Sequence, residues 1–402
     1  MNGILRRNRS VVGLPVGVWI LAAATAYGNG LAAQRIVVRK LPELLPAELA
    51  PLFSERQADL RERVVEPDTA WPRDKKRKDR NLWHRVAMDV AAETESKDAR
   101  MAAALRFPRE KMAAKRLYGK INKRGGSGLL IWVIEDLFNQ LVAAFREGAQ
   151  EDIIRSSGYL VHFAVDAAFP FGATANHDGK PTENLHLGRV RLGRPQYAHR
   201  HVAARFGGEL IRRNRGRYAE SLDLSAGDYD PVDEPVSRTR SVLLASLAEL
   251  DAVLQADREV VDWMEVTEGN ALLERADEYY QLLDQKCGDI CVERLGHGAV
   301  FAANLIGGAW TAAGKPSLQE IRGRSDGNAE VEAELTAAVN VPKNPVNSTQ
   351  GPIIGSRHSN IYHVRGCTFG KQIAPDNLVT FKSVAEAKKD GRRACRVCKP
   401  PP

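Results

Sequence analysis

Apolar residues recur at three- and four-residue intervals through the middle of the chain. The pattern begins near Leu129 and is clearest in LLIWVIEDLFNQLVAAF, and a second helix is predicted over Ile153 to Phe169. Alternating patterns typical of strands are nearly absent from this region. The body of the protein is therefore predicted to be an all-helical bundle, mainly α, whose helix ends and loops carry the chemistry. Further helices are predicted over 197–215, 237–256, 268–287 and 289–312.

The first residues have the pattern of an export signal. Three arginines precede an apolar run from Val11 to Ala23, and Ala24-Thr25-Ala26 is typical of a cleavage site. The alternative is a membrane anchor, but the run is shorter than the ~20 apolar residues of a membrane span and contains Pro15. We expect residues 1–26 to be a signal peptide and the mature chain to begin at Tyr27. The mature protein would be exported, periplasmic or extracellular, with no stable membrane span.

The composition changes again near the C-terminus. A polar segment rich in Gly, Pro, Asn and Ser, including VPKNPVNSTQGP, is predicted to be a linker over 316–354. It separates a helical domain, 27–315, from a small module, 355–402. A length of 402 residues fits two domains. The formal net charge of +8 favours polyanionic partners without naming one.

Three of the five cysteines lie in the small module. Three residues separate His363 from Cys367, two separate Cys395 from Cys398, and 27 lie between the pairs. Two short chelating pairs that converge on one ion are typical of structural zinc, and thiolates with an imidazole suit zinc better than calcium or magnesium. The alternative is a Cys395–Cys398 disulfide with His363 at the surface.

The segment IYHVRGCTFGKQIAPDNLVTFKSVAEAKKDGRRACRVCKP resembles the Ada-type metal-binding module over about 45 residues. That family uses four cysteines, and His363 here takes the place of the first. The resemblance implies a small zinc-stabilised α+β module that is structural or contacts DNA or RNA, rather than a methyl acceptor. Several basic residues flank the second pair and could touch phosphates or simply be solvated: Arg392, Arg393, Arg396 and Lys399.

A second candidate metal site lies in the helical domain. His162 and Asp166 are four residues apart on a predicted helix, so they share one face. Asp68, in Pro67-Asp68, and His84, in Trp83-His84, contribute one more oxygen and one more nitrogen. Together they predict a zinc site of two histidines and two aspartates.

These pieces resemble the superfamily of zinc-dependent phospholipases C and fungal single-strand nucleases over residues 27–312. The resemblance implies an all-helical fold with a three-zinc cluster, in which Asp68, His84, His162 and Asp166 form the first site. The backbone of Tyr27 would chelate another ion. The matching elements also include LPELLPAELAPLF, Asp89, Gly128 to Trp132, Asn176 to Gly179, and Ala309-Trp310.

The chain departs from that superfamily at the other two sites. Gln34 stands where a nearby histidine is expected, and Gly172 stands at the histidine that follows a proline after the aspartate. A later His and acidic pair is replaced by Ala203 and Gly207. Four nearby histidines could substitute or could be ordinary surface residues: His177, His186, His199 and His201.

The sequence thus predicts an exported zinc-dependent phosphodiester hydrolase of nuclease or phospholipase C type, with a zinc-bound hydroxide as nucleophile. Its substrate would be nucleic acid or phospholipid. The alternative is a catalytically degenerate zinc protein that binds nucleic acid or another polyanion without hydrolysis. An arginine-rich stretch near the expected cleft could bind phosphates or be a solvated helix face: Arg194, Arg200, Arg205, Arg212, Arg213, Arg215 and Arg217.

Overall fold

The chain forms two compact units, the first up to Val331 and the second from Glu332. In the first unit, the computed structural model describes residues 30–71, 82–94, 96–121, 128–177, 201–222, 224, 229–265, 272 and 274–323. In the second it describes 353–356, 361–364, 367, 370, 373, 377–395, 398 and 400.

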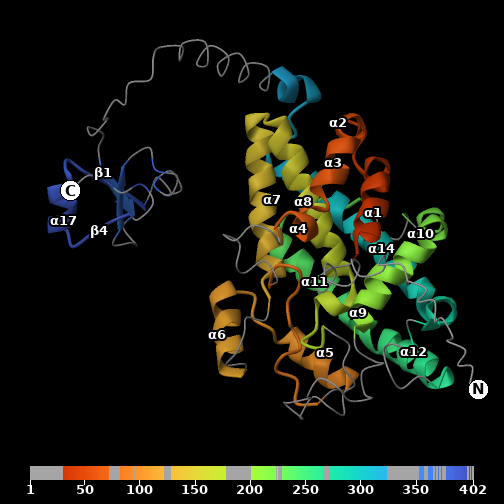
Figure 1. Ribbon diagram of the computed structural model, residues 1–402. Coiled ribbons are helices and arrows are strands. Elements are labelled where there is room, and N and C mark those ends of the chain that lie inside the picture. Colours follow the sequence, from red (N-terminus) through yellow and green to blue (C-terminus); the bar gives the residue numbers. More distant parts are fainter. Residues whose placement is uncertain are drawn as a thin grey trace, which may run out of the picture. The chain divides into compact units, whose positions relative to one another are not determined.

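The first unit is helical in all of its longer described elements (Figure 1). The mainly α fold predicted from the periodicity is therefore confirmed. In chain order the helices are α1 (Leu31–Leu44), α2 (Ala50–Glu55), α3 (Gln57–Arg63), α4 (Glu66–Thr69), α5 (Lys97–Leu105), α6 (Lys111–Ile121), α7 (Leu130–Glu147), α8 (Gln150–Ala168), the 3-10 turn η3 (Pro170–Gly172), α9 (Val202–Ala204), the π-helix η6 (Arg205–Leu210), α10 (Ile211–Glu220), α11 (Pro235–Ala248), α12 (Leu250–Trp263) and α14 (Ala276–Ala312).

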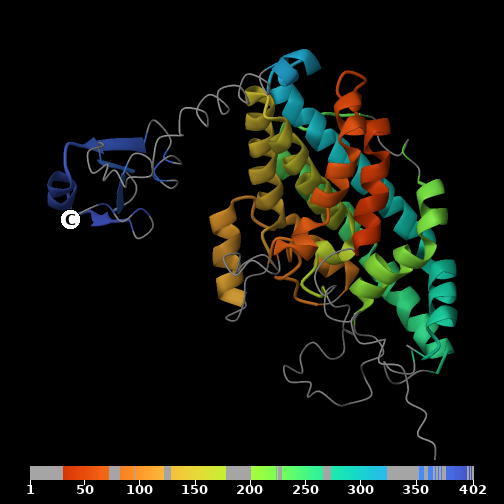
Figure 2. The same ribbon diagram turned by 45° about the horizontal axis from the view of Figure 1, so that its top comes forward.

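Helix α8 lies in the middle of this unit. It packs against α7, α14, α3, α11 and α1, and nearly all of its residues from Ile153 to Ala168 are buried. Figure 2 shows α7, α8 and α14 running side by side through the bundle. Because α8 is surrounded by other helices, its polar residues must find partners inside the protein.

Several predicted helix boundaries are corrected by the structure. The periodicity at Leu129 and at Ile153 gave α7 and α8, but the single helix predicted over 237–256 is two helices that meet at Glu249. The two helices predicted over 268–287 and 289–312 form one long helix, α14. Its backbone is non-helical only at Cys287, where φ is −142° and ψ is 15°. The helix therefore kinks at Cys287, where the sequence pattern predicts that one helix ends and another begins.

The second unit contains a four-stranded sheet in the order β3-β1-β2-β4. Its elements are β1 (Ile353–Ser356), β2 (Ile361–Val364), β3 (Leu378–Phe381), α17 (Val384–Lys389) and β4 (Arg393–Ala394). β1 pairs antiparallel with β2 and β3, and β4 runs parallel to β2. The side chain of Ser383 caps α17 by accepting a hydrogen bond from the Glu386 amide. A small core of Ile353, Tyr362, Phe381 and Ala387 holds the sheet and helix together.

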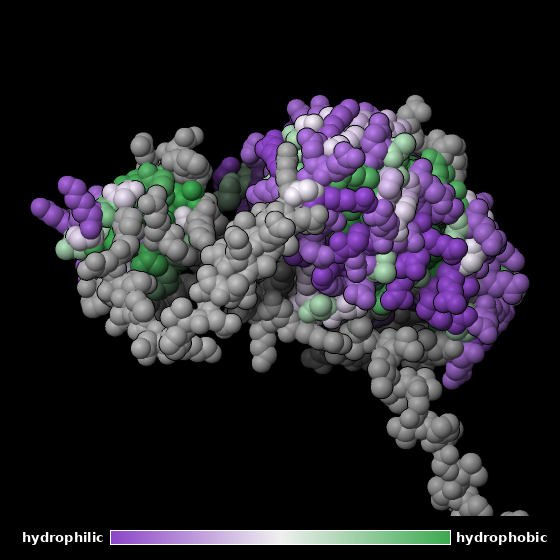
Figure 3. Space-filling model, turned by 90° about the horizontal axis from the view of Figure 1, so that it is seen from above, coloured by the Kyte–Doolittle hydropathy of each residue, from purple (hydrophilic) through white to green (hydrophobic). Residues whose placement is uncertain are grey.

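Both ends of the predicted linker belong to folded elements. Residues 318–323 are helical, with Ile321 buried, and β1 begins at Ile353 rather than at the predicted module start, Gly355. None of the described helices is both long enough and apolar enough to cross a membrane. Figure 3 shows a mostly hydrophilic face of the helical unit, with apolar residues scattered over it.

One close contact between backbones is a test of this packing. Gly308 on α14 lies directly under the segment that carries Val232, and a Cβ at Gly308 would meet the Val232 carbonyl oxygen at 2.0 Å. Gly119 on α6 has nothing within 4 Å of such an atom.

We expect Gly308→Ala to lower the free energy of unfolding by about 1–3 kcal/mol through overpacking. Gly119→Ala should raise it by about 0.5–1 kcal/mol, because alanine loses less entropy in a helix. Urea unfolding followed by tryptophan fluorescence measures both changes. The described tryptophans all lie in the helical unit: Trp71, Trp83, Trp132, Trp263 and Trp310. Equal effects of the two substitutions would contradict the close contact.

Candidate metal centres

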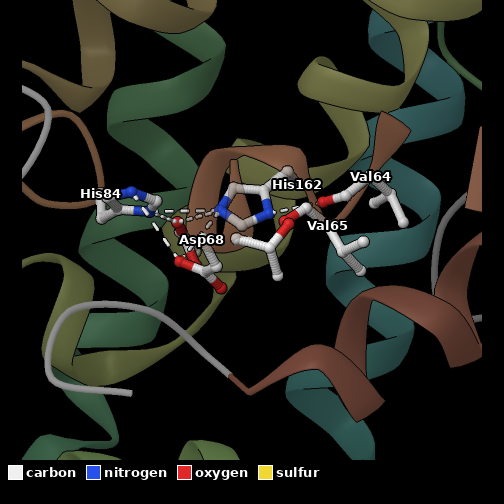
Figure 4. Close-up of polar contacts among 7 residues, drawn as sticks. Val64, Val65, Asp68, His84 and His162 are labelled. Atoms are coloured by element: carbon white, nitrogen blue, oxygen red, sulfur yellow. Dashed lines mark hydrogen bonds and ion pairs between the residues drawn. The ribbon is translucent and has the colours of Figure 1, made fainter. Parts of the chain in front are cut away.

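Four side chains from three separate segments meet at the base of α8. Asp68 comes from α4, His84 from the segment before α5, and His162 and Asp166 from successive turns of α8. Figure 4 shows Asp68, His84 and His162 pointing toward one another. These are the four residues predicted for the first zinc site, and one donor atom from each of Asp68, His84 and His162 lies within 4.8 Å of the others.

The distances match those of a metal site with room for one ion. His162 Nε2 lies 3.2 Å from His84 Nδ1, and Asp68 Oδ1 lies 4.0 Å from His162 Nε2. Ligand atoms around a tetrahedral zinc ion at 2.0–2.1 Å are roughly 3.3 Å apart. The two nitrogens are therefore at the right separation, and Asp68 would close in by less than about 1 Å.

Asp166 holds both histidines. Its Oδ2 atom lies 2.8 Å from His84 Nδ1 and 3.4 Å from His162 Nε2. Asp166 could act as a fourth ligand beside His84 Nδ1. It could instead orient His84 by accepting a hydrogen bond from Nδ1, and His84 Nε2, 3.9 Å from Asp68 Oδ1, would then bind the ion.

A hydrogen bond to the backbone fixes the orientation of the His162 ring. Its Nδ1 atom lies 2.8 Å from the carbonyl oxygen of Val64, which follows α3 and accepts the hydrogen bond (Figure 4). This bond leaves Nε2 directed toward Asp68 and His84. A backbone carbonyl on the outer nitrogen is the usual arrangement for a metal-binding histidine.

His84 is held in place although it lies outside any helix. The amide of Val86 donates to the Gly172 carbonyl at 2.7 Å, and the amide of Met88 donates to the Ala173 carbonyl at 3.0 Å. Asp89, one of the residues in the resemblance, accepts hydrogen bonds of 2.6 Å from the Thr174 hydroxyl and from the Ala175 amide. Asp89 therefore ties the loop together rather than contributing to the metal group.

Burial and mutual charge set the protonation of the group. Burial alone would lower the pKa of His162, but the Asp166 and Asp68 carboxylates outweigh it and raise that pKa to about 9. Burial would raise the pKa of Asp166, yet His162 and His84 lower it to about 2. Burial raises the pKa of Asp68. These shifts favour a protonated His162 beside an ionised Asp166.

Aromatic rings form one wall of the site. Phe163 lies 5.0 Å from His162 and 5.3 Å from His84 between ring centroids, and Trp71 packs edge-on against Trp83 and Tyr159. The sequence analysis missed Trp71, Tyr159 and the Val64 carbonyl. Trp71 carries no ligand atom, the Tyr159 hydroxyl donates to Glu66 instead, and a backbone acceptor leaves no trace in residue identity.

The structure places most of the residues that stand where the resemblance leads one to expect further metal ligands. Gly172 is buried, and a Cβ there would meet the Asp166 carbonyl oxygen at 2.2 Å, so this backbone admits no side chain at that position. Gln34 is buried in α1. Ala203 and Gly207 lie in α9 and η6. Tyr27, His186 and His199 lie outside the described residues. His177 and His201 are described and belong to neither metal-binding group.

The second group lies in the small unit. Donor atoms of His363, Cys367, Cys395 and Cys398 all lie within 4.8 Å of one another, and His363 Nδ1 is 3.4 Å from Cys367 Sγ. The parallel pairing of β2 with β4 sets Tyr362 beside Ala394, so that His363 and Cys395 follow at neighbouring strand ends. All four cysteine and histidine side chains predicted for the module thus converge, and they could hold a metal ion.

Several arginines that could bind phosphates according to the sequence have acidic or backbone partners in the structure. Arg205 pairs with the buried Asp257, Arg212 and Arg213 pair with Glu209, and Arg217 pairs with Asp284. In the small unit, Arg392 donates to Asp390 and to the Ser356 carbonyl and stacks over Phe381. These cations stabilise their own units. Arg194, Arg200 and Arg396 lie outside the described residues.

Comparison with models of protein families and with curated protein sequences finds no match for this chain.

The two groups make a prediction about stoichiometry. We expect the full-length protein to hold one metal ion per group after loading with zinc and desalting. His162→Ala should remove one ion and Cys395→Ser the other, whereas His297→Ala, at a histidine outside both groups, should remove none. Plasma mass spectrometry measures the ions per chain, and an unchanged content in His162→Ala would rule out the helical site.

The remaining cysteines make a prediction about reactivity. Cys287 and Cys291 are buried free thiols, and burial raises the pKa of Cys287 to about 12. Because the thiolate is the reactive form, both should resist iodoacetamide at pH 8 in the native protein and react in urea. The native rate at Cys287 should rise about tenfold per pH unit below its pKa. Rapid native labelling, read by peptide mass spectrometry, would contradict the burial.

Proposed function

We propose that the helical unit is a zinc-dependent hydrolase of phosphodiesters, of nuclease or phospholipase C type, and that Asp68, His84, His162 and Asp166 hold its ion. The observation that supports this best is the convergence of two imidazoles and two carboxylates in one buried group. Nitrogen and carboxylate ligands of this kind are those of catalytic zinc sites.

A zinc ion in such a site lowers the pKa of water toward 7 and polarises a phosphoryl oxygen. The residues of the chain supply the rest. The Val64 carbonyl keeps the Nε2 atom of His162 available, and Asp166 holds His84. Asp68 is the most accessible member, with 15% of its side chain exposed, whereas His162 is fully buried. A substrate would therefore reach the group past Asp68.

The alternative function is supported by a specific contact. A side chain at Gly172 would collide with the Asp166 carbonyl, so the described residues do not rebuild a second ion beside the first. Paired ions clamp the attacking and leaving oxygens of a phosphodiester, and one ion lacks that clamp. A protein that keeps a single structural ion and binds a polyanion without cleaving it is the second candidate.

For the small unit we propose a structural zinc ion bound by His363, Cys367, Cys395 and Cys398. A unit with a core of this size gains much of its folding free energy from the metal. Because Arg392 is occupied within the fold, contact with DNA or RNA would fall to the exposed Arg393. We further propose that the protein acts outside the cytoplasm, as its N-terminal pattern indicates.

The hydrolase proposal predicts the effect of removing a ligand. We expect zinc-loaded protein to hydrolyse bis(p-nitrophenyl) phosphate, and His162→Ala and Asp166→Ala to lower kcat/KM by about 100-fold or more, because the ion loses its position. His297→Ala should leave the rate unchanged. The same variants are then assayed on single-stranded DNA, RNA and phosphatidylcholine.

Full activity in His162→Ala and Asp166→Ala would remove these residues from the mechanism. One ion per helical unit without hydrolysis of any of the four substrates would favour the non-catalytic alternative.

A further inference from the structure

Arg240, on α11, is a buried cation without a carboxylate partner. Only 8% of the residue is exposed, and its Nη1 atom is fully buried with no hydrogen-bond partner in the described part of the chain. The other arginines that are buried to this degree behave differently. Arg100 pairs with Asp251, and Arg294 pairs with Glu293. Arg240 therefore stands out among the described buried arginines.

Its charged neighbour is a second cation, Arg109. Burial and the charge of Arg109 both lower the pKa of Arg240. The backbone of Arg109 is fixed against α7, because Trp132 on α7 donates from its indole nitrogen to the Arg109 carbonyl at 3.2 Å. Since α11 packs against both α7 and α5, the link between α5 and α6 brings Arg109 toward Arg240. The side chain of Arg109 is exposed.

The surface next to this pair is also positive. Exposed cations follow along the link and the outer face of α6: Arg106, Lys115, Arg116 and Lys120. Three acidic residues lie close to this surface: Glu110, Glu135 and Asp136, of which Asp136 pairs with Lys111 at 3.6 Å. The balance favours an incoming anion over an incoming cation.

We propose that Arg240 and Arg109 form a binding site for a phosphate group, separate from the metal ligands. A buried guanidinium without a counter-ion is costly, and an anion bound at the accessible edge of Arg240, beside Arg109, would offset both charges. The planar fork of arginine suits the oxygens of a phosphate, which it can bind with two parallel hydrogen bonds. The site rests on α11 and on the α5–α6 link and does not depend on the proposed hydrolysis.

The test is calorimetric titration of the full-length protein with inorganic phosphate, against sodium chloride of equal ionic strength. We expect saturable binding that becomes about tenfold weaker or undetectable in Arg240→Met and in Arg109→Met. Arg215→Met, at an exposed arginine on α10, is the matched control and should bind as the native chain does. Circular dichroism verifies the fold of each variant, and Arg109→Met keeps the test valid if Arg240→Met fails to fold.

Two further arms separate this site from the metal group and identify the source of the phosphate. Binding should persist in His162→Ala, and its loss there would assign the phosphate to the metal group and overturn the proposal. Sedimentation with phosphatidylcholine vesicles that contain phosphatidic acid, abolished by Arg240→Met, would identify a lipid headgroup. Phosphate binding without sedimentation would identify a small phosphorylated ligand. Absence of phosphate binding to the native chain, or equal binding to all variants, would refute the site.

Discussion

The contact between His162 and Asp166, in the buried C-terminal half of α8, is the constraint on which the helical unit depends. Both side chains are almost fully removed from water, with 0% and 2% exposed. Isolated charges at that depth would cost several kcal/mol each, so each must be matched by a partner. His84 and Asp68 are drawn toward the same point, and the turn after α3 presents the Val64 carbonyl to the outer nitrogen of His162. The packing of α3, α4 and α8 follows from these requirements.

The loop that carries His84 shows how the fold meets them. A loop residue has no helix to fix its direction, so the chain ties residues 86–89 to the turn that ends α8. Asp89 supplies two hydrogen bonds to that tie, which explains why a carboxylate only five residues from His84 is not part of the metal group. The same turn contains Gly172, whose lack of a side chain lets the Asp166 carbonyl approach. Ligand placement and close backbone packing therefore depend on one another here.

Much of this was predictable from local sequence patterns. The spacing of His162 and Asp166 depends only on the helix period, and the paired ligands of the small unit depend only on short chelating intervals. In the described structure the members of each group lie close to one another. The break at Glu249 and the continuity of α14 through Cys287 were not predictable, because neighbouring helices decide where a helix bends. Arginine pairing was missed for a similar reason. Asp257 and Asp284 are far from Arg205 and Arg217 in sequence and meet them only in the folded bundle.

The glycines at the departures from the resemblance limit what the described helical site can do. Gly172 contacts the Asp166 carbonyl. The Gly207 carbonyl accepts a hydrogen bond of 3.0 Å from the Gly30 amide. A Cβ on Gly30 would lie 2.9 Å from the Cα atom of the next residue, Gly208. A side chain at Gly172 would push the two backbones apart, so a ligand cannot be restored at that position by substitution alone. The described ligands form a group that could hold one ion, whereas paired ions clamp both the attacking and the leaving oxygen of a phosphodiester. If the unit cleaves phosphodiesters, the contact that a second ion would make with the leaving oxygen would have to come from side chains of the protein.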